Sequence, residues 1–318
     1  MEQRYTQASD FWRERDFGQK ISAAFEFIGA HWRPLGRVML YLVMPAALLH
    51  VVLNGIIQSN VLDSVRGASY RGGVGSGSVF GTRMGMYNSM FSSPLYYVSN
   101  FFGVAFYTVL VLSIYGYVLC CVYPPHPGQP VEVADVWAVV KRRFIGTFFS
   151  FYGVWIIIAL AFIVLFIPGI YMSVVLSLFF VVSVMEDTGF GATINRCVSL
   201  TKGKWWSTFG LLFILGLLLW VLFAGIGIAT ALFGSGMRGV FSFVGAFPMV
   251  ALIIANLFSL LVTLLFYPPM MLALAFQYFN LVERHEGVGM HQLVSQLGQP
   301  QPAGPSDTTY RPDDEGEY

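Results

Sequence analysis

The chain has 318 residues, of which 56% are hydrophobic and 11% are charged. Soluble domains carry about 25% charged residues, so this composition excludes an ordinary water-soluble fold and indicates an integral membrane protein. The formal net charge of +1 and the lack of a long basic block give no support for binding to nucleic acid.

Uncharged apolar runs predict an all-α integral membrane protein with six transmembrane helices. A helix needs about 20 residues to cross the hydrocarbon core, and the predicted spans cover about residues 38–57, 100–122, 147–167, 170–185, 205–233 and 250–280. The fourth run makes only about 24 Å of helix. Residues 147–185 therefore either cross twice or form a re-entrant hairpin, and two crossings are favoured because 147–167 can cross alone.

The regions outside these spans predict the domain organisation. Residues 1–16 form a polar N-terminal segment, 17–290 the membrane domain, and 291–318 a disordered tail rich in polar residues. The glycine-rich connection at 58–97 lacks the pattern of a phosphate-binding loop and is predicted to be a flexible linker.

Proline residues predict where the helical segments turn or bend. Because proline cannot donate a backbone hydrogen bond and disfavours helix in the residue before it, Pro168 and Gly169 are expected to form a tight turn between two spans. A kink is expected in the last span at Pro268 and Pro269, and another at Pro45.

Three amphipathic segments are expected to lie on the membrane surface, because their apolar residues recur at helical spacing just before a span. They begin near Phe17, Val131 and Phe190. Together with the span pairs that follow, they form a weak threefold repeat. The basic and aromatic residues at their edges are candidate contacts for lipid headgroups: Trp32, Arg33, Arg142, Arg143, Arg196, Lys202, Lys204, Trp205 and Trp206.

The positive charges predict the orientation. Fourteen of the 18 Lys and Arg residues fall on the side that holds both termini and the three amphipathic segments, and four fall on the other side. Positive charge favours the cytoplasmic side, so both termini are expected in the cytoplasm.

Two polar side chains inside the first predicted span form the candidate intramembrane site. His50 and Asn54 are one helical turn apart and should share a face. A polar pair in the membrane suggests a function, because burying it without partners is costly, although hydrogen bonding to a neighbouring helix is the commoner role.

Other candidate chemistry is weaker. The adjacent acids Glu186 and Asp187 are interpreted as the start of the following helix, where the helix dipole favours negative charge. His285 and His291 flank Glu286, which we interpret as a solvated boundary. The three cysteines have no spacing typical of a disulfide framework or zinc site. The pattern predicts no catalytic residue, metal or cofactor.

Three stretches carry a family resemblance: IPGIYMSVVLSLFFVVSVMED, TINRCVSLTKGKWWSTFG and FQYFNLVERHEG. The chain resembles the bacterial multi-pass proteins named after the membrane domain of glycerophosphoryl diester phosphodiesterase. The resemblance implies a six-helix module in the bacterial inner membrane, sometimes fused to a barrel phosphodiesterase. The residues after Leu281 are far fewer than the roughly 250 of such a barrel, so that activity is not expected.

Three hypotheses for function follow. The leading one is a non-catalytic module that organises membrane lipids, especially anionic ones, or membrane-protein partners through its cytoplasmic surface helices. The alternative is a small-molecule transporter or channel component, which the repeat, the interrupted helices and the pair of His50 and Asn54 would suit. An intramembrane lipid-modifying enzyme ranks third.

Overall fold

The computed structural model describes residues 8–71, 91, 93–126, 129–236 and 248–297, and every regular element in these ranges is helical. Five helical segments are long and apolar enough to cross a membrane, or six when one bent pair of helices counts as a span. The chain is therefore a helical protein suited to a membrane. The six segments correspond in order to the six predicted spans.

The first helical stretch comprises α1 (Ala8–Phe11), α2 (Phe17–Val38), the π-helical turn η1 (Met39–Val43) and α3 (Met44–Arg71). α2 is kinked at His31, where φ is −113° and ψ is 20°, three residues before Pro34. η1 ends two residues before Pro45, which cannot donate to the carbonyl one turn earlier. α3 continues through residue 71, so the prediction of a linker starting at residue 58 is wrong for residues 58–71. Residues 72–90 and 92 lie outside the described residues.

The middle of the chain forms α5 (Pro94–Val122), α6 (Val133–Val164), α7 (Phe166–Leu176) and α8 (Phe179–Glu186). α6 contains the second amphipathic segment and the third predicted span in one continuous helix. No break separates the predicted surface segment from the predicted span, and the threefold repeat stays a prediction. The helix continues because no proline interrupts the run from residue 133 to residue 164.

The predicted turn at Pro168 and Gly169 is also wrong. The chain reverses at Leu165, where φ is −161° and ψ is 147°, and Pro168 is the third residue of α7. A proline fits the first turn of a helix, because the N–H groups there have no intrahelical acceptor.

The last part of the chain forms α9 (Phe190–Thr201), α10 (Trp205–Gly236), α12 (Pro248–Glu286) and α13 (Val288–Leu297). α9 and the first part of α10 meet at 100°. α12 continues as one helix through Pro268 and Pro269, so the double proline does not break it. The kink expected there stays a prediction. α13 shows that residues 291–297 are helical rather than disordered, and residues 298–318 lie outside the described part.

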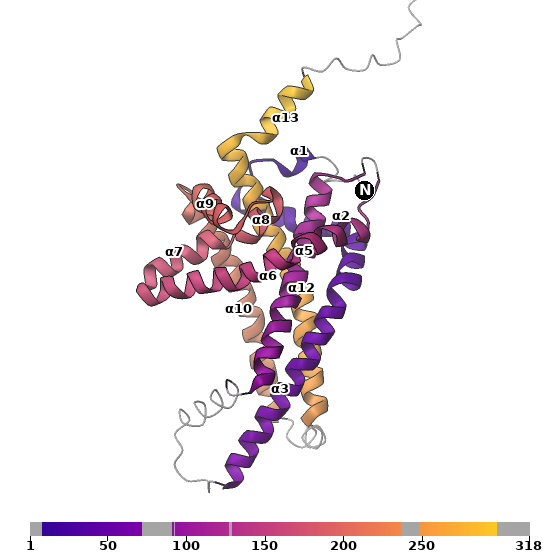
Figure 1. The fold of residues 1–318 in the computed structure, drawn as a ribbon, viewed down its shortest axis with the longest axis vertical. Coiled ribbons are helices and arrows are strands. Elements are labelled where there is room, and N and C mark those ends of the chain that lie inside the picture. The colour runs from indigo at the N-terminus through magenta and orange to yellow at the C-terminus, as the bar shows by residue number, and fades with distance from the viewer. Residues whose placement is uncertain (1–7, 72–90, 92, 127–128, 237–247, 298–318) are drawn as a thin grey trace, which may run out of the picture.

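Four helices, α3, α5, α10 and α12, follow the long axis of the molecule, whereas α6 and α7 form a hairpin that projects sideways (Figure 1). α6 packs on α5 and α7. This direction differs from the expectation of two spans parallel to the others. At the tip of the hairpin, Ile163 and Ile167 are 78% and 79% exposed.

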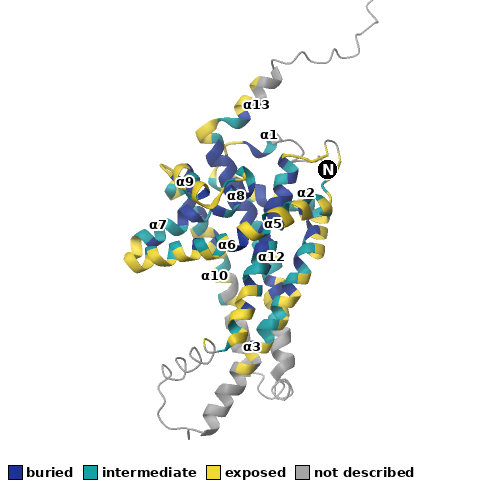
Figure 2. Cartoon of the chain, in the orientation of Figure 1, coloured by how far each residue is buried: buried dark blue, intermediate teal, exposed yellow. Residues whose placement is uncertain are grey.

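Buried residues are concentrated at the end of the molecule that holds α1, α8 and the C-terminal part of α12 (Figure 2). Phe11 is fully buried there and packs on Phe27, Phe276 and Phe279, with ring centroids 5.6 to 6.3 Å apart. Residues 8–16, expected to be a polar segment apart from the membrane domain, therefore contribute to its core. α1 also contacts α13, so the two ends of the described chain lie at the same end of the fold.

Candidate functional site

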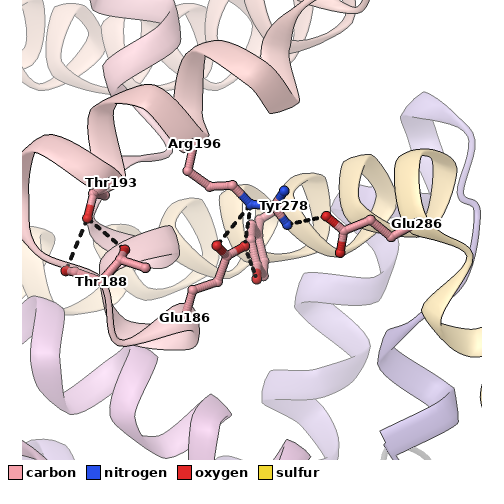
Figure 3. A network of polar contacts seen from close by, with 6 residues as sticks. All are labelled: Glu186, Thr188, Thr193, Arg196, Tyr278 and Glu286. Atoms are coloured by element: carbon pink, nitrogen blue, oxygen red, sulfur yellow. Dashed lines mark hydrogen bonds and ion pairs between the residues drawn. The ribbon is translucent and has the colours of Figure 1, made fainter.

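The charged cluster consists of Glu186, Arg196, Tyr278 and Glu286, which join the end of α8, the middle of α9 and the end of α12 (Figure 3). The Arg196 Nε atom donates to both carboxylate oxygens of Glu186 at 2.9 Å. Its Nη2 atom forms an ion pair with Glu286. The Tyr278 hydroxyl donates to Glu186 Oε1 at 3.1 Å.

The turn between α8 and α9 holds Glu186 in place. Asp187 adopts a left-handed conformation with φ of 52° and ends α8. The Thr193 hydroxyl bonds the carbonyls of Thr188 and Gly189 at 3.2 and 2.9 Å, which ties the start of α9 to the turn. The interpretation of Glu186 and Asp187 as the start of a helix is wrong: Gly189 is the N-cap of α9, and both acids face arginines.

A second set of ion pairs lies beside the charged cluster. The Asp187 carboxylate is 2.9 Å from Nη2 of Arg143 and 3.5 Å from Nη2 of Arg142. Arg143 is only 10% exposed at its side chain, and its Nη1 atom donates to the Ser183 carbonyl. These contacts attach α6 to the end of α8.

The charged cluster is largely saturated by its own members. Arg196 faces two carboxylates, and although burial disfavours its charge, the hydrogen bonds to Glu186 and Glu286 raise the pKa of Arg196 above its ordinary value. A guanidinium fixed by two acids is not free to bind a headgroup. The cluster is thus suited to holding three helices together rather than to acid–base chemistry.

An apolar groove lies between α2, α10 and α12, with a volume of about 570 Å³. Every residue that lines it is apolar or glycine. Its rim is exposed: Phe25, Trp32, Leu218 and Leu265 are each more than half accessible. Pro268 and Pro269 also line the groove.

A polar cluster, which we call the Lys20 cluster, lies near the N-terminal ends of α2 and α10 and toward the C-terminal end of α12. It comprises Lys20 of α2, Ser207 and Thr208 of α10, and Gln277 of α12. The Lys20 Nζ atom lies 3.5 Å from Ser207 Oγ, and Gln277 Nε2 donates to Thr208 Oγ1 at 3.0 Å. Lys20, Thr208 and Gln277 are buried. This cluster was not predicted from the sequence, although a polar residue such as Gln277 within an apolar run indicates a buried polar contact.

The intramembrane pair is confirmed as neighbours on one helix. The side chains of His50 and Asn54 lie within 3.0 Å of one another. The His50 ring stacks on Phe106 of α5, with centroids 5.5 Å apart. A Cβ atom added to Gly103 would lie 2.9 Å from His50 Cε1. The pair therefore sits in a close contact between α3 and α5.

The predicted headgroup contacts divide into two groups. Arg143 and Arg196 are engaged by carboxylates, as described above. The others stay accessible: Trp32, Arg33, Arg142, Lys202, Lys204 and Trp206 are exposed. Trp205 is half-buried and stacks on Tyr171 and Phe209, with centroids 6.0 and 5.0 Å apart.

No cluster of three His, Cys, Asp or Glu residues suited to a metal occurs among the described residues. Comparisons with known proteins add no relatives: no protein-family model, curated protein or solved structure matches the chain.

Proposed function

We propose that the chain is a non-catalytic, multi-pass membrane module that binds lipid and organises partners at the cytoplasmic face of a bacterial inner membrane. The observation that carries the proposal is the apolar groove between α2, α10 and α12. It lies on helices that are long and apolar enough to cross a membrane.

The lining of the groove favours a lipid chain over a polar solute. A volume of about 570 Å³ falls in the range of small-molecule sites, yet the lining offers no polar side chain to orient a polar molecule. Its accessible rim, including Trp32 and Leu218, would face acyl chains in a bilayer. A lipid tail would restore the dispersion contacts that an empty groove loses.

The cytoplasmic orientation is supported by charge and by the meeting of the two described ends. Most Lys and Arg residues lie on one side of the predicted topology, and α1 contacts α13 at the corresponding end of the fold. The first part of α2, before the kink at His31, and α9, which meets α10 at 100°, are the proposed surface helices.

Partner binding is supported by the projecting hairpin of α6 and α7. Its apolar side chains are highly exposed, including Trp155 at 73% and Ile163 at 78%. Exposed apolar surface of this kind is typical of a contact with lipid or another membrane protein. The transporter hypothesis rests largely on His50 and Asn54, and their mutual contact and packing on α5 account for that pair structurally.

The groove is tested by filling it. Leu218 lines the groove, whereas its neighbour Leu217 does not and is similarly exposed. We expect Leu218→Trp to lower the amount of phospholipid that the purified chain retains after transfer from phosphatidylcholine nanodiscs to micelles, measured by native mass spectrometry. Leu217→Trp should retain as much as the wild type. Equal retention by the two variants would overturn the proposal.

A further inference from the structure

Lys20 is a buried cation without an acidic partner among the described residues. It is 3% exposed, and among the described residues its ammonium group has one hydrogen-bond contact, the 3.5 Å approach of Nζ to Ser207 Oγ. Arg284 repels its charge and Asp16 attracts it, but no carboxylate in the described chain lies within ion-pair distance. A buried ammonium is costly unless an anion compensates it.

Gln277 carries a second unsatisfied group near the same turn, an acceptor that a headgroup hydroxyl, but not a phosphate oxygen, could satisfy. It is fully buried, and its Nε2 atom donates a hydrogen bond to Thr208 Oγ1. Its Oε1 atom has no hydrogen-bond partner in the described part of the chain. Ser207 and Thr208 are adjacent in the first turn of α10, so Lys20 and Gln277 each contact this turn. The N-terminal end of a long helix favours an anion.

The Lys20 cluster lies next to the apolar groove: Ile21, the residue after Lys20, lines the groove, although no member of the cluster does. On α10, Ser207 shares a helix face with the groove residues Ile214 and Leu218, which follow at seven and eleven positions. On α12, Gln277 is one turn from the groove residue Ala273. The site therefore has a cationic end and an apolar body along the same helices.

On α10, the distance from the Lys20 cluster to the far end of the groove matches one leaflet of a bilayer. From Ser207 to Leu219, the last groove residue on α10, the helix rises about 18 Å. Half of a hydrocarbon core is about 15 Å. Trp205 and Trp206 stand at the cationic end, where aromatic rings suit the headgroup layer.

We propose that the groove and the Lys20 cluster form a binding site for one anionic phospholipid. The phosphate would lie beside Lys20 at the start of α10, and an acyl chain would follow the groove. A net negative headgroup is favoured over a zwitterionic one, because the neighbouring cations Lys20 and Arg284 repel a choline group. The inference rests on the proposed function and adds the class of lipid.

Headgroup preference tests this site. Nanodiscs of equal parts phosphatidylglycerol and phosphatidylcholine with the same acyl chains supply the two lipids, and native mass spectrometry counts those that the full chain retains. We expect the wild type to retain phosphatidylglycerol preferentially. Lys20→Met should lower this preference about fivefold and leave total retention unchanged, while Lys20→Arg should keep it. Lys141→Met removes an exposed charge on α6 and should behave as wild type.

A second variant keeps the test decisive if Lys20→Met does not fold. Ser207→Asp supplies Lys20 with a carboxylate and should abolish the preference by neutralising the site. Equal retention of both lipids by the wild type, or a preference that survives in Lys20→Met or Ser207→Asp, would overturn the inference. If Leu218→Trp lowers lipid retention but the wild type shows no headgroup preference, the inference is overturned and the proposed function stands.

Discussion

The charged cluster and the Lys20 cluster lie toward the same end of the molecule and differ in one respect. In the charged cluster, Arg196 forms ion pairs with two carboxylates, and the Tyr278 hydroxyl donates a hydrogen bond to one of them. In the Lys20 cluster, a buried ammonium and a buried amide oxygen have no acidic or donor partner among the described residues.

This difference separates a structural role from a binding role. Polar groups that satisfy one another hold helices together, because removing one member leaves its partners unpaired. Polar groups that are buried and unsatisfied reduce stability until a ligand supplies the missing partner. The comparison predicts that substitutions in the charged cluster destabilise the fold, whereas substitution of Lys20 changes lipid binding.

The largest effect is expected for Arg196→Met. The variant leaves Glu186 and Glu286 without their shared partner, and we expect the free energy of unfolding to fall by about 2 kcal/mol. Partial exposure of the three side chains, 20% to 42%, keeps this value below that of a fully buried pair. Reversible unfolding in mixed detergent micelles measures it.

Arg142→Met provides the matched control for Arg196→Met. Its side chain is 64% exposed and lies 3.5 Å from Asp187, so its loss should cost less than about 0.5 kcal/mol. A similar loss of unfolding free energy in the two variants would show that the charged cluster stabilises the fold no more than an exposed ion pair does.

A smaller effect is expected for Tyr278→Phe. This variant removes only the hydroxyl that donates to Glu186, and the expected loss of unfolding free energy is about 1 kcal/mol. Tyr171→Phe is the control, since that ring is 43% exposed and its loss of a hydroxyl should change stability by less than about 0.5 kcal/mol. The same unfolding assay compares them, and an unchanged Tyr278→Phe would show that the Tyr278 hydroxyl does not stabilise the charged cluster.

The smallest effect on stability is expected for Lys20→Met in micelles free of lipid. Lys20 is a buried cation without an acidic partner among the described residues. Replacing it by an apolar side chain of similar length should change the free energy of unfolding by less than about 0.5 kcal/mol or raise it. Added phosphatidylglycerol should then stabilise the wild type more than the variant, because a ligand stabilises the state that binds it. A large loss of unfolding free energy in lipid-free micelles would show that Lys20 has a structural role, as the charged cluster does.

The sequence by itself determined the helical class and the positions of the apolar helices, because crossing a bilayer requires a local run of apolar residues whose backbone satisfies itself. It placed α5 and α10 within a few residues of their observed starts and ends. It misplaced the turn at Leu165, because a proline such as Pro168 is equally compatible with the first turn of a helix.

Only the tertiary structure decided which polar residues meet. Glu186 and Arg196 are close in sequence, but Tyr278 joins them across 92 positions, and Lys20 approaches Ser207 across 187. Helical periodicity places a side chain on a face without saying which helix that face will contact. The same limit explains why Phe11, within a charged segment, was not expected in the core. The packing of the helices determines which residues far apart along the chain become partners. The sequence alone therefore cannot distinguish a cluster whose polar groups all have partners from one whose polar groups do not.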